Sequence, residues 1–169
     1  DVYKRQIKMK SIDEKTNAIR FLSQKKLKYS VYKYDTDKAL SGMEVASVLG
    51  KNPINVFKTL VTVGASNHNY VFLVPVYEEL DLKKAAKVVG EKSISMIKQS
   101  ELYPLTGYVH GGCSPLGMKK FFSTYIDSSI TGCETIIFSG GKIGLQIEIS
   151  LSELSKVLDY KLADLAILK

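Results

Sequence analysis

Residues 106–117 read Thr-Gly-Tyr-Val-His-Gly-Gly-Cys-Ser-Pro-Leu-Gly and hold four glycines and a proline between two apolar segments. A stretch so poor in large side chains adds little to a hydrophobic core. It can instead present backbone N–H groups that a ligand approaches closely, because no Cβ stands in the way. Glycine-rich loops also occur as plain tight turns, so the stretch alone is consistent with either a binding loop or a structural turn.

Two further motifs accompany this loop, Phe-Lys-Thr-Leu at 57–60 and Ser-Gly-Gly-Lys-Ile-Gly-Leu at 139–145. Alternation along the predicted strand 57–63 places Lys58 on the face opposite Phe57 and Thr59. This pattern fits an exposed lysine at a sheet edge. It also fits an ammonium inside a cleft, where it binds a phosphate, carboxylate or ester oxygen.

The composition is that of one globular domain. The chain has 169 residues, 45% of them hydrophobic and 24% charged. No apolar run approaches the roughly 20 residues of a membrane span, and two cysteines are too few for a disulfide framework or a zinc site. We therefore expect a cytoplasmic protein with no membrane contact, no metal and no cofactor.

Positive charge is concentrated at the N-terminal end. The net charge is +7, and residues 1–30 carry nine Lys or Arg against three Asp or Glu, a balance of +6. This segment is consistent with a solvated helix or with a basic edge that attracts RNA. The basic pairs Lys83-Lys84 and Lys119-Lys120 leave the same two interpretations open, ordinary solvated surface or contact with a tRNA acceptor stem.

The first residues form a separate segment in our interpretation. Asp-Val-Tyr-Lys-Arg-Gln at 1–6 does not begin with Met and back-translates readily to a transposon-end adapter used in sequencing libraries. We expect residues 1–8 to be a non-native or disordered extension, with translation beginning at Met9. The functional domain then spans 9–169.

Apolar periodicity and capping signals predict a single α/β domain with a mixed sheet. Three capping boxes, beginning at Ser11, Ser41 and Ser150, open helices, and glycines at 50 and 90 close two of them. The predicted helices cover 11–25, 41–49, 81–89, 99–102 and 150–158, with Leu82 on the buried side of the third, and the predicted strands cover 28–34, 57–63, 70–76, 93–97, 122–126, 135–138 and 144–149.

The usual hydrolytic motifs are not found in the sequence. It has no Gly-x-Ser-x-Gly elbow, His-Glu-x-x-His helix or Walker-type loop. His110 and Cys113 suggest a Cys/His nucleophile, but three residues on a glycine-rich loop need not meet, and small buried cysteines are common. Asp127 and Glu148 fit turn and strand-surface positions better than an acid/base pair. An enzyme built from this sequence works through backbone donors, a lysine and the substrate's own groups.

Taken together, the three motifs resemble the YbaK/EbsC family of aminoacyl-tRNA deacylases, which is related to the editing domain of bacterial prolyl-tRNA synthetase. The similarity runs from about Ile19 to Ala166 and includes Leu-Asp-Leu-Lys-Lys-Ala-Ala-Lys at 80–87. It implies an α/β fold with a mixed, partly closed, barrel-like β-sheet flanked by helices. The implied activity is that of a free-standing editing enzyme, which cleaves the ester between a mischarged amino acid and the terminal ribose of tRNA.

The resemblance also implies roles for five residues. Lys58 falls where the family has its invariant lysine, and Gly111 where a site glycine presents its backbone N–H; both are expected to be catalytic. Tyr34, Gly112 and Gln146 are expected to bind substrate. Many members carry aspartate at the position of Gln146, so this chain lacks a negative charge there. Relatives usually carry aliphatic residues where His110 and Cys113 stand, which favours structural roles for both.

The expected substrate is Cys-tRNA(Pro), with prolyl-tRNA synthetase as a further partner. That synthetase cannot exclude cysteine or alanine by size, since one methylene gives only about 1–3 kcal/mol of discrimination. A cysteinyl thiol, with a pKa of about 8.5, can attack its own ester carbonyl while the Gly111 and Gly112 amides stabilise the oxyanion. Three alternatives stay open: a deacylase for alanine, a non-catalytic tRNA-binding module, and a hydrolase of free amino-acid esters.

Overall fold

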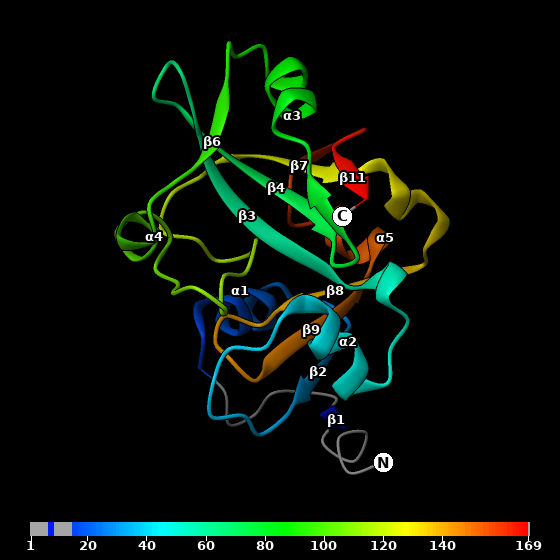
Figure 1. Cartoon of the computed structure of the whole chain (residues 1–169). Coiled ribbons are helices and arrows are strands. Elements are labelled where there is room, and N and C mark those ends of the chain that lie inside the picture. Colours follow the sequence, from blue (N-terminus) through cyan, green and yellow to red (C-terminus); the bar gives the residue numbers. More distant parts are fainter. Residues whose placement is uncertain (1–6, 9–14, 169) are drawn as a thin grey trace.

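The computed structural model describes residues 7–8 and 15–168 and contains two main sheets that share one core (Figure 1). The four-stranded sheet has the order β1 (Ile7–Lys8), β2 (Tyr29–Lys33), β9 (Leu145–Ser150) and β8 (Thr135–Ser139). The five-stranded sheet has the order β10 (Tyr160–Ala163), β7 (Ser123–Asp127), β4 (Asn69–Pro75), β3 (Phe57–Gly64) and β6 (Ile94–Met96). A two-stranded ribbon joins β11 (Ala166–Leu168) to β5 (Glu78–Leu80).

The expected mixed strand pairing is confirmed. β7 runs parallel to both β4 and β10, and the other ladders are antiparallel. The near-continuous apolar run of β4 places Val71 and Leu73 in the main core, and Phe72 and Val74 in a second cluster beneath a helix. Both faces of β4 are therefore covered, as expected for an interior strand.

The expectation of one partly closed sheet was wrong. Within the described residues, the two main sheets meet at a single bridge between Val56 and Ile137 and do not close into a barrel. Beyond that bridge β3 and β8 diverge. Residues of both sheets, among them Lys58 and Ser139, line one cavity in the gap. The opening that prevents closure is thus the space available for a ligand.

Helices cover the outer faces of the sheets and one side of the gap. The helices are α1 (Asn17–Lys25), α2 (Gly42–Leu49), α3 (Leu82–Val89), α4 (Gln99–Thr106) and α5 (Leu151–Leu154), with short 3-10 turns η2 (Pro53–Asn55) and η3 (Ser128–Gly132). α1 packs into the main core, α2 against Tyr32 and Tyr34 of the β2 region, and α3 against the far face of β4. Of the described helices, none has the length and apolarity needed to cross a membrane.

Local capping signals located some helix ends well and others poorly. The Ser41–Glu44 capping box is present, and Gly50 and Gly90 end α2 and α3 in the left-handed conformation. α1 begins only at Asn17, where Thr16 is the N-cap, and the expected box at Ser11 lies outside the described residues.

The box at Ser150 is half formed. Ser150 accepts from the Glu153 N–H, but the Glu153 carboxylate accepts from the Lys28 N–H instead of reaching back. α5 ends at Leu154, four residues earlier than predicted.

Two further expectations differ from the structure. α4 runs through Pro104 to Thr106 instead of ending at Leu102. Leu82, placed on the buried side of α3 by its periodicity, is 39% exposed. The expected extension 1–8 falls mostly outside the described residues. The backbone of residues 7–8 pairs with β2 as β1, and the non-native origin of the segment stays a prediction.

Candidate functional site

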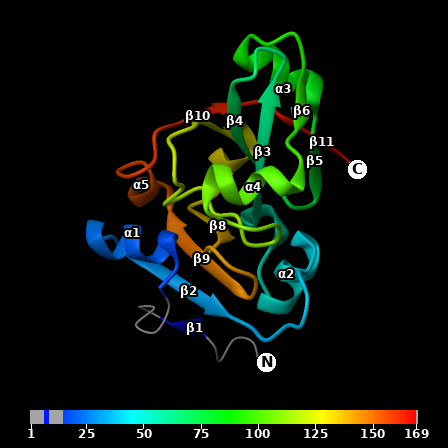
Figure 2. The same ribbon diagram turned by 90° about the vertical axis from the view of Figure 1, so that its left-hand side faces the viewer.

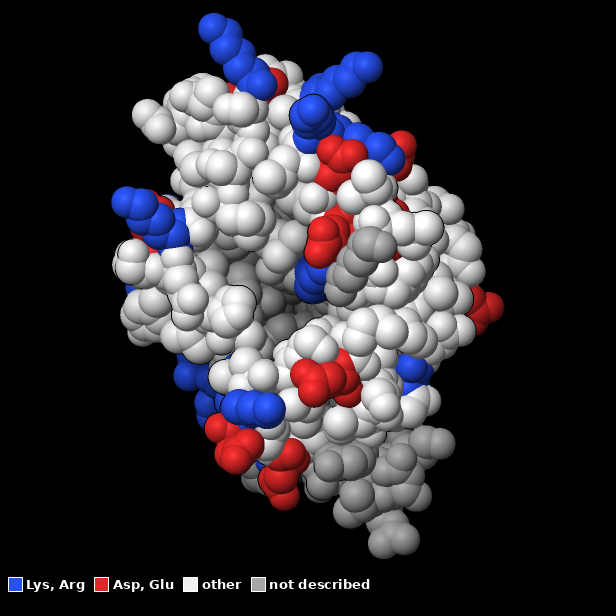
Figure 3. All heavy atoms as spheres, viewed as in Figure 1, with Lys and Arg blue, Asp and Glu red and all other residues white. Residues whose placement is uncertain are grey.

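One cavity of about 580 Å³ brings three of the five predicted site residues together: Lys58, Gly111 and Gln146. Figure 2 looks onto α4, with β3 behind it and α2 to one side. Figure 3, drawn in the view of Figure 1, shows a face of the molecule that is hollowed near its centre. The remaining described lining residues are Ala39, Leu40, Ser41, Gly42, Val45, Val56, Phe57, Thr59, Leu60, Val61, Val76, Met96, Ile97, Gln99, Leu102, His110, Cys113 and Ser139.

Lys58 reaches the cavity because the edge of β3 is only partly covered. β6 pairs with β3 from Thr62 to Gly64, whereas 57–61 border the cavity. A strand edge exposes residues of both faces, which explains why Lys58 and its neighbour Thr59 line the same space. Lys58 is half-buried. It therefore does not have the exposed-edge position that the sequence left open, and it lines the cavity.

Thr59 adds a polar atom that the sequence analysis did not single out. Its hydroxyl oxygen is buried and has no hydrogen-bond partner among the residues that the structure describes. A buried hydroxyl left unpaired costs about 1–3 kcal/mol. Because this atom has almost no accessible surface, a ligand or water in the cavity reaches it only if the wall opens. The position of Thr59 beside Lys58 is the only sequence signal that it lies at the site.

The glycine-rich loop folds as a tight turn whose two central glycines have different roles. Gly111 has φ +86°, and a Cβ there would lie 2.8 Å from the Cβ of Ala39. A Cβ on Gly112 would lie 2.8 Å from the Cα of Lys142. Both positions therefore require glycine, one for its backbone angle and both for close packing.

The backbone amides of these glycines are not equivalent. The Gly112 N–H donates to the Val109 carbonyl at 2.9 Å, which closes the turn. For the Gly111 N–H, no acceptor is found within the described part of the chain. Of the two amides expected to stabilise an oxyanion, only that of Gly111 is therefore available as a donor. Gly112 has a structural role, because its backbone closes the turn and packs against the 139–145 loop.

The 139–145 motif holds the opposite wall. The Gly140 N–H donates to the Leu145 carbonyl at 2.8 Å, and the Gly140 carbonyl accepts from the Thr16 hydroxyl at 2.6 Å. Gly144, at φ +86°, accepts from the Tyr34 N–H at 3.0 Å. The motif thus joins the helix start at Thr16 to the strand end at Tyr34 and presents Ser139 to the cavity.

Tyr34 lies behind the cavity wall rather than in it. Its hydroxyl accepts from the Gln146 side-chain amide at 3.4 Å, and both residues are 6% exposed. Burial raises the pKa of Tyr34 above its usual value, against the opposing effect of the Gln146 hydrogen bond. The phenol is therefore neutral at physiological pH, and it positions Gln146, the residue that faces the cavity.

The Cys113–His110 pair does not have the properties of a nucleophile and its base. Both residues line the cavity, but no described hydrogen bond joins them. Burial raises the pKa of the Cys113 thiol to about 12, against the opposing effect of a hydrogen bond with Thr106. Because the reactive form of cysteine is the thiolate, this thiol is inert near neutral pH.

No carboxylate lines the cavity among the described residues, and Lys58 is the lysine within its wall. Asp127 accepts from the Leu165 and Ala166 N–H groups, and Glu148 accepts from Tyr32 and Thr135. Both acids therefore have structural roles, as expected. The arrangement can bind an oxygen-rich or anionic group and polarise a carbonyl, but among the described lining residues it contains no carboxylate to act as a general base.

The wall contributed by α4 and β6 was not predicted. Two of its residues, Gln99 and Leu102, come from α4. The other two, Met96 and Ile97, lie at and just after the end of β6, which is placed by its pairing with β3. Their residue types carry no reactive group, so the sequence offered no signal that they belong to a site.

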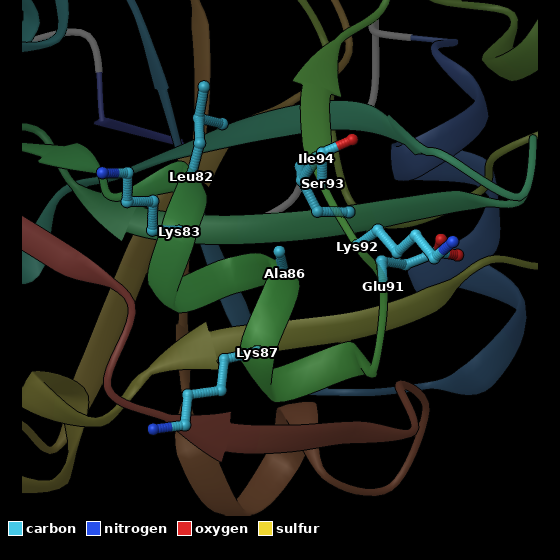
Figure 4. Close-up of a pocket in the computed structure, with 8 residues that line it drawn as sticks. All are labelled: Leu82, Lys83, Ala86, Lys87, Glu91, Lys92, Ser93 and Ile94. Carbon is cyan, nitrogen blue, oxygen red and sulfur yellow. The ribbon is translucent and has the colours of Figure 1, made fainter.

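A second hollow of about 500 Å³ lies between α3 and β6 (Figure 4). Lys83, Lys87 and Lys92 line it together with Glu91. The Glu91 carboxylate already accepts from the hydroxyls of Ser66 and Tyr70. Lys84 does not line this hollow: its ammonium bonds Asp164 and the Ala166 carbonyl and thereby attaches α3 to the C-terminal ribbon. None of the five predicted site residues lies here.

Comparisons with known proteins agree with this geometry. The family model of the aminoacyl-tRNA editing domain matches residues 37–157. A candidate Cys-tRNA(Pro)/Cys-tRNA(Cys) deacylase, EbsC of Enterococcus faecalis, is 44% identical over 142 residues, which are 83% of this chain and 87% of that protein.

Among solved structures, a candidate trans-editing enzyme for prolyl-tRNA synthetase superposes with a TM-score of 0.79 at 27% identity, covering 92% of this chain and 99% of the other. A hypothetical protein, APE2540, has a TM-score of 0.81 at 19% identity, covering 89% and 99%, and shows the shared fold.

Proposed function

Because the chain belongs to the family of aminoacyl-tRNA editing domains, we propose that it is a trans-editing deacylase that removes a mischarged amino acid, above all cysteine, from tRNA(Pro). The observation that carries the proposal is a single cavity that contains the Lys58 side chain and the Gly111 turn but no described carboxylate. Such a site can hold and polarise an ester, and it leaves the attack to a group on the substrate.

In the proposed reaction Lys58 and Gly111 act on the same ester. The ammonium binds the oxygen-rich end of the acylated ribose, and the Gly111 N–H donates to the carbonyl oxygen as negative charge develops there. A preorganised donor of this kind typically contributes about 10²–10³ in rate. Orientation of the reacting groups supplies the rest of the rate enhancement.

The attacking group is the thiol of the cysteinyl ester itself. Its sulfur bonds to the carbonyl carbon, the bond from that carbon to the ribose oxygen breaks, and the thiol proton ends on the ribose oxygen. Water then hydrolyses the resulting cyclic thioester. A free thiol has a pKa of about 8.5 and is partly ionised near neutrality, whereas the Cys113 thiol, with its pKa of about 12, is not. The substrate is therefore the better nucleophile.

Selection of the amino acid depends on the walls of the cavity. Apolar side chains such as Phe57, Val61 and Leu102 favour a small uncharged side chain. The neutral Gln146 amide offers a polar contact without a fixed charge. A site built in this way tests the amino acid a second time, after the synthetase has charged it. This makes prolyl-tRNA synthetase a proposed partner and the cytoplasm the proposed location.

The test is deacylation of Cys-tRNA(Pro), Ala-tRNA(Pro) and Pro-tRNA(Pro) by the wild type and Lys58→Ala. We expect the cysteinyl ester to be cleaved well above its spontaneous rate, and Lys58→Ala to lose about 10²-fold or more. Lys161→Ala is the matched control, since Lys161 is exposed on β10. If none of the three esters is cleaved faster than its spontaneous rate, the proposal that the protein is a deacylase is contradicted.

Other results would select the alternatives. Preferential cleavage of the alanyl ester identifies an alanine deacylase, in which water or a ribose hydroxyl attacks. Salt-dependent tRNA binding without turnover identifies a binding module, for which the neutral Gln146 is the suggestive feature. Equal rates on free amino-acid esters and on acylated tRNA identify a small-molecule hydrolase.

A further inference from the structure

Two aromatic side chains, one on each side of the glycine-rich loop in the chain, are highly exposed. Tyr103 of α4 is 56% exposed, and Phe121, which follows the glycine-rich loop, is 79% exposed. Single exposed rings are common on protein surfaces, so what surrounds these two rings decides their role.

Tyr103 lies on the helix that forms one wall of the cavity. Gln99 lines the cavity, and Tyr103 follows it by four residues on the same helix. Residues four apart share one helix face, and four residues advance about 6 Å along the axis. The exposed ring is therefore about one helical turn from the cavity-lining Gln99 and adjacent in the chain to the cavity-lining Leu102.

Lys119 connects this ring to the end of the glycine-rich loop. Its ammonium lies 4.6 Å from the centroid of the Tyr103 ring, and its N–H donates to the Thr106 carbonyl at 3.1 Å. Phe121 is two residues further on, within about 7 Å of extended chain. Phe122 packs against the main core, so the backbone beside Phe121 is anchored while its ring stays exposed.

The charge around the two rings is positive. Lys119 and Lys120 are exposed, and neither pairs with a carboxylate within the part of the chain that the structure describes. Arg20 lies nearby as well. It donates to Asn17, whose amide, like the Lys119 stem, lies beside Gly107. Exposed rings flanked by uncompensated cations are the combination that binds single-stranded nucleic acid.

We propose that Tyr103, Lys119, Lys120 and Phe121 form an acceptor platform, on which the unpaired 3′ nucleotides of RNA stack while the terminal ribose enters the cavity. This inference rests on the proposed function for the identity of the ligand. The rings stack with bases, and the lysines contact phosphates. Paired bases hide their faces inside a duplex, so the platform selects an unpaired tail and not the helical stem.

The experiment measures binding, which does not depend on turnover. Two labelled RNA hairpins share one stem, and one of them carries an unpaired 3′ tail of about four nucleotides ending in CCA. We expect the wild type to bind the tailed hairpin about tenfold or more tightly than the blunt one. The double variant Tyr103→Leu/Phe121→Leu keeps the apolar bulk and should lose this difference.

Three controls accompany the double variant. Tyr103→Phe combined with Phe121→Tyr keeps both rings and should keep the preference for the tail. Leu168→Ala removes a side chain that is 72% exposed on β11, on the other side of the molecule from α4 in Figure 1, and should change nothing. Lys119→Ala should weaken binding and reduce the slope of log affinity against log salt by about 0.7.

Equal affinity of the wild type for tailed and blunt hairpins would overturn the platform, as would a double variant that still prefers the tail. Neither result changes the outcome of the deacylation assay. Conversely, an inactive wild type that still binds the tail through the two rings supports the platform and contradicts the proposed enzyme. The two ideas therefore fail separately.

Discussion

The Gln146 side-chain amide donates to the Tyr34 hydroxyl at 3.4 Å and thereby joins the wall of the cavity to the aromatic residue behind it. Gln146 pairs with Tyr32 across the β2–β9 ladder, and the Tyr34 N–H donates to the Gly144 carbonyl. The position of the amide is thus fixed from its own strand and from the neighbouring one. A side chain held in this way can orient a substrate without taking part in bond breaking.

Tyr34→Phe tests this positioning role. Removal of the hydroxyl leaves the Gln146 amide with one partner fewer in a buried place, so we expect a loss of about 1 kcal/mol in the free energy of unfolding. The KM for Cys-tRNA(Pro) should rise more than kcat falls. Urea unfolding and steady-state deacylation measure the two effects. A large fall in kcat at unchanged KM would instead assign Tyr34 to the chemical step.

Gly111→Ala should abolish most of the activity. Alanine at φ +86° costs about 1–2 kcal/mol, and its Cβ would lie 2.8 Å from the Ala39 Cβ, so the donor N–H must move. We expect kcat to fall about 10²-fold or more. Gly132→Ala is the control, because a Cβ there meets nothing within 4 Å. Equal loss in both variants would point to folding and not to the donor.

Cys113→Ala should retain kcat within a few-fold. Because burial raises the pKa of the thiol to about 12, the thiolate is a very small fraction of the population at pH 8. We also expect alkylation of Cys113 by iodoacetamide to be slow at pH 8. Mass spectrometry of the treated protein, with Cys133→Ser to leave a single thiol, measures that rate. A loss of activity comparable with that of Lys58→Ala would show that Cys113 takes part.

Glu148 should make the protein sensitive to acid. Burial alone raises the pKa of this carboxyl, but hydrogen bonds from Thr135 and Tyr32 and the charge of Lys51 outweigh it and hold the pKa below its usual value. A lowered pKa in the folded state stabilises the protein above the unfolded value of about 4.5, and the contribution is lost as the pH falls through the folded pKa.

The measurement is urea unfolding of wild type and Glu148→Gln across pH 7 to 3. The two proteins should differ at pH 7 and converge as the pH falls below about 4.5. Thr135→Val keeps the carboxylate and should show a smaller effect in the same direction. A gap between wild type and Glu148→Gln that stays constant with pH would contradict the assignment.

Much of the local structure could be predicted because its causes lie within a few residues. Each of these signals involves residues close together in the chain. Examples are the Ser41–Glu44 capping box, the helix-ending glycines at 50 and 90, and the apolar run of β4. The 135–149 hairpin is equally local. Lys58 and Gly111 could be identified from the sequence because each lies in a short motif of consecutive residues. The structure brings both into one cavity.

Other features depend on neighbours that are distant in the chain. α4 continues through Pro104 while it packs across the gap, and β11 pairs with β5 more than eighty residues earlier. The Thr16 hydroxyl donates to the Gly140 carbonyl, 124 residues further along the chain. No periodicity or motif records these contacts, since they arise only when the chain has packed.

The amino-acid sequence by itself determined the family, the mixed α/β class and the identity of the reactive groups, because side-chain chemistry and short-range capping are properties of the chain. The tertiary structure decided that the two sheets diverge beyond the Val56–Ile137 bridge and that the resulting gap becomes the cavity. The physical reason is that closure of a sheet depends on whether two distant edges can satisfy each other's hydrogen bonds. Here the edge of β3 borders a cavity instead.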